Sequence, residues 1–263
     1  MTFTAAHRGG AGTPLVCVHG FTDTWRTWEL VLPALERRHA VLAPTLPGHA
    51  GGPPLGEATD SALVDAVEAV MDDAGIERAH LVGNSMGGYV AFLLAERGRA
   101  ESVVALAPGG GWAIGDDAYR ENLAFFAATY ERSRQAAPHA DAIAASPNGR
   151  RRATEFIAER YEHIPADLIA HQIVGAARCD ATLPLVDRAL RDGWSIRAEH
   201  VRCPVRIVWG THDRLLEWPR AAARYRHEWF PQADWVELDA VGHCPQLDVP
   251  LETAQLILGF TSR

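Results

Sequence analysis

Short apolar runs rich in β-branched residues alternate with longer segments of helical periodicity through the first 112 residues of this chain. Strands are expected at 14–20, 79–83 and 101–108, and in a run at 40–52 that passes into a Pro/Gly loop. Helices are expected at 27–38, 59–75 and 86–98. Because the strands are apolar on both faces, the pattern predicts a parallel sheet covered by helices on two sides.

This alternation stops after the sequence PGGGW at 108–112. Residues 113–198 contain no convincing strand and resemble several short helices, after which the strand–helix pattern resumes. We expect strands at 204–210 and 234–239, a helix at 217–230 and a last helix from about Pro250. The prediction is one α/β domain, formed by residues 1–112 and 199–263, with a helical cap inserted at 113–198. Within it, Asp60 or Ser61 is expected to cap the helix at 59–75.

Composition excludes several classes of function. The 263 residues carry a net charge of −8, so no basic field would attract nucleic acid. There is no lysine, which rules out a Schiff base. No apolar stretch has the character of a signal peptide or the length of a membrane span. The four cysteines are scattered and no histidines have metal-ligand spacing. We therefore expect a cytoplasmic protein with free thiols and no metal, cofactor or membrane partner, as a monomer or homodimer.

The sequence GNSMGG at 83–88 places Ser85 directly after a strand and before a helix. This strand–turn–helix setting is typical of a nucleophile elbow, in which a strained turn is tolerated because small residues flank the nucleophile. Gly83 and Gly87 meet that need. The amide of Met86 would lie at the helix N-terminus, where negative charge is favoured. No role follows for Asn84.

A serine hydroxyl needs a base, and the base needs an orienting acid. Asp213 and His243 each follow a predicted strand, in the order Ser, Asp, His, so their loops should open at the same edge of the parallel sheet as Ser85. Asp239 is a rival for the acid, and His212 fits an ordinary loop histidine.

The second donor of an oxyanion hole is expected in the loop after the first buried strand. The amide of Phe21 is placed for this, with His19 in a structural role. No GxGxxG motif follows a strand, which argues against hydride transfer.

The motifs HGF at 19–21, GNSMGG at 83–88, WGTHD at 209–213 and GHC at 242–244 together resemble the α/β-hydrolase superfamily over nearly the whole chain. The resemblance implies an α/β-hydrolase fold with a helical cap after the sixth strand. It also implies an acyl-enzyme mechanism in which Ser85 attacks, His243 relays the proton and Asp213 orients His243.

The subfamily is left open by these motifs. The opening HGFTDTWRTW is similar to that of epoxide hydrolases, but those carry a Pro after HGF and an Asp nucleophile. GNSMGG with APGGGW is similar to hydrolases that cleave carbon–carbon bonds in ring-fission products, which usually carry a Trp after the catalytic His, where this chain has Cys244. Cofactor-free perhydrolases share the triad.

We expect an apolar pocket between the sheet and the cap, with Trp25, Trp28, Trp112 and Met86 as candidate lining residues. The predicted function is hydrolysis of a small-molecule carboxylic ester or lactone. Carbon–carbon hydrolysis or perhydrolysis by the same triad is the enzymatic alternative. A ligand receptor without catalysis is the alternative from a different class.

Overall fold

Seven strands form one sheet in the computed structural model, which describes residues 1–262. Their order across the sheet is β1-β3-β2-β4-β5-β6-β7. Only β1 runs antiparallel, against β3, and every other neighbouring pair is parallel. The strands are β1 (Ala6–Gly9), β2 (Thr13–Val18), β3 (His39–Pro44), β4 (Ala79–Asn84), β5 (Ala100–Leu106), β6 (Val205–Gly210) and β7 (Asp234–Leu238).

Both faces of the sheet are covered, as the apolar strands predicted. Successive side chains of a strand point to opposite faces. Along β2, Val16 and Val18 pack in one cluster with α2 (Asp60–Asp73) and α3 (Met86–Glu96). Leu15 and Cys17 pack in another cluster, which includes α1 (Leu32–Leu35) and α10 (Pro250–Thr261). The carboxyl ends of the parallel strands therefore share one edge, which is where the candidate residues follow β2, β4, β6 and β7.

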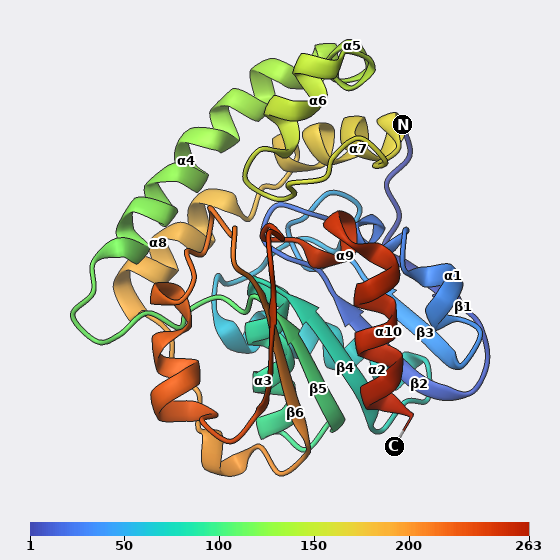
Figure 1. Ribbon diagram of the computed structural model, residues 1–263, viewed down its shortest axis with the longest axis vertical. Helices are drawn as coiled ribbons and strands as arrows, with labels where there is room; N and C mark the ends of the chain where they lie inside the picture. The colour runs from blue at the N-terminus through green and yellow to red at the C-terminus, as the bar shows by residue number, and fades with distance from the viewer. Residues whose placement is uncertain (263) are drawn as a thin grey trace.

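Residues 113–198 form helices and no strand, as expected. They include α4 (Ala118–Ala136), α5 (Ala140–Ala145), α6 (Pro147–Thr154), α7 (Ala166–Ala177) and α8 (Thr182–Asp192). Figure 1 shows these cap helices at the top of the view, above the ends of the strands. The cap follows β5, which is the fifth described strand and not the sixth. The resemblance implied the sixth; the sequence itself predicted four strands before the cap, and the structure adds β1.

Three local predictions differ from the structure for identifiable reasons. The helix expected at 27–38 is a 3-10 turn at Trp25–Trp28 followed by the short α1, because Pro33 cannot donate the bond that a continuous helix needs. The cap of α2 is Thr59, whose hydroxyl accepts from the amide of Ala62 at 3.1 Å.

The segment expected as a helix at 217–230 is irregular and contains a π-helical turn at Tyr225–Trp229. There the Arg224 amide donates to the Gly111 carbonyl and the Tyr225 hydroxyl donates to the Gly109 carbonyl. The bond from the Arg224 amide replaces a regular helical bond, and the Tyr225 hydroxyl also fixes this segment against the loop after β5. Among residues 1–262, no helix is both long enough and apolar enough to cross a bilayer.

Candidate active site

Ser85 occupies a strained turn between β4 and α3. Its φ of 56° lies in the left-handed region, which is unfavourable for a residue with a side chain. The flanking glycines are required by close packing of the backbone. A Cβ on Gly83 would lie 2.1 Å from the Gly87 carbonyl oxygen, and one on Gly87 would lie 2.1 Å from the Val18 carbonyl oxygen. The turn thus holds Ser85 at the end of β4, with the Met86 amide at the N-terminus of α3.

His243 and Asp213 form a buried pair. His243 Nδ1 lies 2.7 Å from Asp213 Oδ2, while Asp213 Oδ1 accepts from the amides of Leu215 and Leu216 at 2.9 and 2.7 Å. Because a carboxylate accepts, this pairing assigns the imidazole proton to Nδ1 and leaves Nε2 as a base. His243 Nε2 is buried and has no hydrogen-bond partner among the described residues. This nitrogen is free to accept a proton.

Ser85 lies where two cavities meet. A narrow cavity of about 80 Å³ is lined by Ser85, Met86 and Trp112, and a wide one of about 1000 Å³ is lined by Ser85 and His243. Phe21 lines both. The narrow cavity is mainly apolar and extends beneath α4 and α8, while the wide one is lined by cap residues from α4 to α7.

The two expected oxyanion donors flank Ser85. A Cβ built on Gly20 would lie 3.2 Å from the Ser85 Cβ, which places the Gly20–Phe21 peptide against the serine. No acceptor within residues 1–262 pairs with the amide of Phe21 or of Met86. Both amides can therefore donate to an oxygen that becomes negative beside Ser85.

His19 fixes the loop that carries Phe21. Its Nε2 accepts from the Leu46 amide at 2.9 Å and its Nδ1 donates to the Gly20 carbonyl at 2.7 Å. Burial holds the pKa of His19 well below its ordinary value, so the ring stays neutral. His19 therefore has a structural role, which is to hold this loop against the Leu46 backbone.

Only one of the three candidate pocket tryptophans lines a cavity with Ser85, and that is Trp112. Trp25 donates from Nε1 to the Thr4 hydroxyl at 2.8 Å and stacks on His7, so it lies at the edge of the domain. Trp28 is fully buried in the cluster beneath α10. The expectation for Trp25 and Trp28 was wrong because the chain turns between Phe21 and Trp25, away from the cavity.

The rival acid and base lie on the surface. Asp239 is exposed and accepts from the Thr211 hydroxyl at 3.4 Å. His212 is exposed and lies 3.9 Å from a carboxylate oxygen of Glu159. Among the described residues, neither side chain forms a hydrogen bond or ion pair with Asp213 or His243.

Asn84, to which the sequence assigned no role, links the nucleophile turn to the histidine loop. The side chain is buried and donates to the carbonyls of Leu106 at 3.0 Å and His243 at 3.1 Å. Its Oδ1 accepts from Gln246 Nε2 at 3.1 Å and from the Cys244 thiol at 3.3 Å. Asn84 therefore fixes the backbone of His243 relative to Ser85. A polar residue directly before the nucleophile is the only sign of this in the sequence.

A second connector missed by sequence reasoning is Asp248. This buried carboxylate accepts from the Gly242 amide at 2.6 Å, next to His243, and from the cap amides of Glu159 at 3.0 Å and Arg160 at 2.8 Å. It therefore joins the histidine loop to the segment between α6 and α7.

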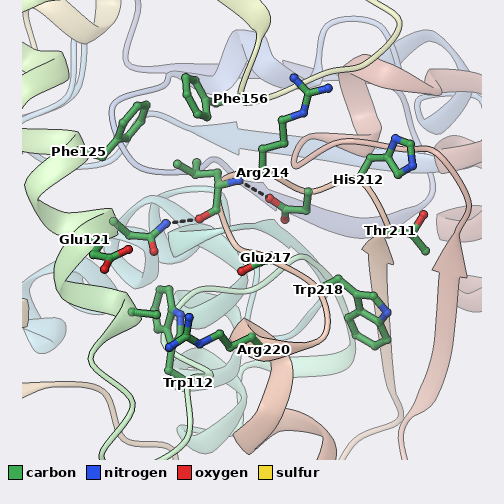
Figure 2. Close-up of a pocket in the computed structure, with 14 residues that line it drawn as sticks. Trp112, Glu121, Phe125, Phe156, Thr211, His212, Arg214, Glu217, Trp218 and Arg220 are labelled. Atoms are coloured by element: carbon green, nitrogen blue, oxygen red, sulfur yellow. Dashed lines mark hydrogen bonds between the residues drawn. The ribbon is translucent and has the colours of Figure 1, made fainter.

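The cap also contacts the acid loop, beside a pocket between α4 and residues 211–220 (Figure 2). On the cap side, the Asn122 side chain donates to the Leu215 carbonyl, and the Leu215 amide donates to Asp213. Arg214, Glu217 and the other charged side chains in Figure 2 surround these bonds, and neither Ser85 nor His243 lines this pocket.

Comparison with known proteins identifies similar chains. The family model described as "Alpha/beta hydrolase family" matches residues 15–256. A protein named epoxide hydrolase EphH, from Mycobacterium tuberculosis, is 32% identical over 203 residues, which cover 77% of this chain and 94% of that protein.

Two solved structures have the same fold. The esterase RhEst1 from Rhodococcus sp. ECU1013 is similar with a TM-score of 0.74 at 23% identity, covering 98% of this chain and 94% of that one. The meta-cleavage product hydrolase CumD from Pseudomonas fluorescens IP01 is similar with a TM-score of 0.72 at 20% identity, covering 98% and 93%. At these identities the structures establish a shared fold and no shared substrate.

Proposed function

The chain belongs to the alpha/beta hydrolase family, and from that premise we propose that it is a serine hydrolase that cleaves carboxylic esters or lactones. The observation that carries the proposal is the buried His243 Nε2, which has no hydrogen-bond partner within residues 1–262 while Nδ1 is held by Asp213. His243 also lines one cavity with Ser85.

In the proposed reaction, Ser85 Oγ attacks the substrate carbonyl carbon as its proton passes to His243 Nε2. The carbonyl oxygen becomes an oxyanion that accepts from the amides of Phe21 and Met86. Asp213 stabilises the imidazolium that forms. His243 then returns the proton to the leaving alcohol oxygen as the ester bond breaks. Water attacks the acyl-enzyme by the same route and releases the acid.

In this proposal the alcohol and acyl portions of the substrate bind in different cavities. His243 must reach the leaving oxygen, and it lines only the wide cavity, so the alcohol portion is assigned there. Met86, one of the oxyanion donors, lines only the narrow cavity, so the acyl chain is assigned there. The wide cavity accommodates leaving groups of varied size, and the narrow one restricts the acyl group.

The nucleophile favours ester cleavage over the epoxide opening that the name of the Mycobacterium tuberculosis relative describes. A carboxylate that opens an epoxide forms an ester, which water can then hydrolyse at its carbonyl. A serine hydroxyl that opens an epoxide would form an ether, which has no carbonyl for water to attack. With Ser85 in the turn after β4, turnover requires an acyl substrate.

A fluorophosphonate probe tests the nucleophile. We expect one covalent adduct, located on Ser85 by peptide mass spectrometry and absent from Ser85→Ala. If the folded protein forms no adduct on Ser85, the serine hydrolase proposal is wrong.

A substrate panel tests the reaction class. It contains p-nitrophenyl esters of increasing acyl length, a lactone, an epoxide and a ring-fission dienoate. We expect the highest kcat/KM on an ester or lactone. Faster turnover of the dienoate would show that carbon–carbon hydrolysis is the reaction, and faster turnover of the epoxide would refute the argument from the nucleophile.

A further inference from the structure

A charged pair interrupts the apolar lining of the narrow cavity. Arg188 of α8 and Asp60 of α2 both line it, together with Ser85 and Tyr89. Arg188 Nη2 donates to Asp60 Oδ2, and the Tyr89 hydroxyl donates to the same oxygen at 2.9 Å. Arg188 is only 8% exposed. The Asp60 side chain is 28% exposed, but an arginine as buried as Arg188 is unusual beside a cavity lined by groups such as Leu63.

Much of the hydrogen-bonding capacity of this pair is unused. A guanidinium has five N–H donors, and within residues 1–262 Arg188 uses only Nη2. Both donors to the Asp60 side chain, Tyr89 and Arg188, bind Oδ2, and Oδ1 accepts no hydrogen bond within residues 1–262. The pair thus offers the cavity both donors and an acceptor.

The local charge is balanced. The carboxylates that act on Asp60 are Asp192 and Glu96, and Arg188 is the cation beside it. Each acid has one arginine partner: Asp60 with Arg188, Asp192 with Arg191, and Glu96 with Arg197. An anionic group would meet the Asp60 carboxylate, and a cationic group would meet Arg188. A neutral group that both donates and accepts meets no such penalty.

The geometry points to a polar subsite, made by Arg188 and Asp60, that binds a hydroxyl group on the far part of the acyl chain. This inference rests on the proposed function and makes it narrower: the substrate class is esters or lactones of hydroxy acids. The hydroxyl accepts from Arg188 and donates to Asp60 Oδ1, and the apolar walls between Ser85 and the pair contact the methylene groups.

The position of Tyr89 indicates the length of such a chain. Tyr89 follows Met86 by three residues of α3, which is about 4.5 Å along the helix axis, and its ring carries the hydroxyl further, to Asp60. A hydroxyl next to the ester carbonyl would be too close to Ser85. Several methylene groups are needed between the carbonyl and the subsite.

The test compares p-nitrophenyl esters of ω-hydroxy acids of six to eight carbons with esters of unsubstituted acids one carbon longer, which have the same number of non-hydrogen atoms. The measured quantity is the ratio of kcat/KM for the hydroxyl and methyl members. A p-nitrophenyl monoester of a dicarboxylic acid is included to test whether the subsite prefers a carboxylate to a hydroxyl group.

The double substitution Arg188→Met with Asp60→Leu removes both charges and so avoids leaving one buried charge unpaired. Arg134→Met, at an exposed ion pair with Glu131 on the cap helix α4, is the matched control.

At the best chain length, we expect the hydroxyl-to-methyl ratio to be roughly tenfold higher in the wild type than in the double variant, the effect of a buried hydrogen bond to a charged group. Arg134→Met should keep the wild-type ratio. An equal loss on both substrates in the double variant would mean that the pair only joins the cap to α2, and the inference would be wrong. Preference of the wild type for the carboxylate-terminated ester would also overturn it.

Binding to Ser85→Ala separates this inference from the proposed function. By calorimetry, methyl 6-hydroxyhexanoate should bind more tightly than methyl heptanoate, and the preference should be lost when the double substitution is added. This measurement does not depend on turnover. Failure of the fluorophosphonate reaction would refute the proposed function, whereas equal binding of the two methyl esters would refute the subsite alone.

Discussion

Replacing Asn84 with alanine removes the side chain that holds the histidine loop against the nucleophile turn. Three neutral hydrogen bonds between nitrogen and oxygen are lost, to the carbonyls of Leu106 and His243 and from Gln246, together with the weaker bond from the Cys244 thiol. At about 1 kcal/mol each, the free energy of unfolding should fall by about 3 kcal/mol. The Leu106 carbonyl keeps the Ser85 amide as a partner, so the unpaired group is the carbonyl of His243. The loosened backbone is therefore that of the proposed base.

The activity of Asn84→Ala should fall with its stability. Displacement of a catalytic group by about 1 Å can lower a rate by about 100-fold, so we expect kcat to fall roughly 10- to 100-fold while KM changes little. Urea unfolding gives the stability, and initial rates on a p-nitrophenyl ester give kcat per folded enzyme. Gln232→Ala, at an exposed position, is the control for side-chain truncation. A normal kcat in a destabilised Asn84→Ala would refute the positioning role, and unchanged stability would refute the count of bonds.

Other substitutions test the remaining assignments. Asp213→Asn should lower kcat by roughly 10³- to 10⁴-fold, whereas Asp239→Asn should leave it unchanged; the reverse result in steady-state kinetics would exchange their roles. Trp28→Ala should lower the free energy of unfolding by about 3–5 kcal/mol in urea without changing acyl preference, and Trp112→Ala should change acyl preference in the ester panel. His49 is buried in the loop after β3, and this burial lowers its pKa from 6.5 to about 4, so the unfolded chain binds a proton first as the pH falls. The stability of the wild type relative to His49→Gln should therefore be full above about pH 6.5 and decline toward pH 4. Urea unfolding at several pH values measures this difference, and a difference that did not change with pH would refute the lowered pKa of His49.

The class of sheet, mostly parallel and covered on both faces, was predictable because strands buried on both faces are apolar throughout; the strand order and the antiparallel β1 were not predicted. Ser85, Asp213 and His243 could be nominated for a related reason. Each lies just after a strand, and the carboxyl ends of parallel strands meet at one edge. Neither inference needs knowledge of how side chains pack, and for that reason both extend to chains without known relatives.

Positions that depend on tertiary packing were not predictable in this way. Trp25, Trp28 and Trp112 look alike in sequence, and only the course of the backbone separates a surface ring, a core ring and a cavity wall. The irregular segment at 217–230 has helical periodicity, but the bond from the Arg224 amide to the loop after β5 interrupts it. In each case a contact between residues far apart in sequence decided the outcome.

The cap is the clearest example of such contacts, because it forms hydrogen bonds with the acid loop, with the segment after His243 and with the loop that carries Phe21. Asn122 holds the peptide whose amide donates to Asp213, Asp248 joins the histidine loop to the cap backbone, and Gln172 of α7 donates to Asp23 in the loop that carries Phe21, at 3.2 Å. A helical insertion in sequence would suggest a separable lid. The bonds indicate instead that displacement of the cap would loosen the acid, the base and the oxyanion loop together. The geometry of these three loops therefore depends on the position of the cap.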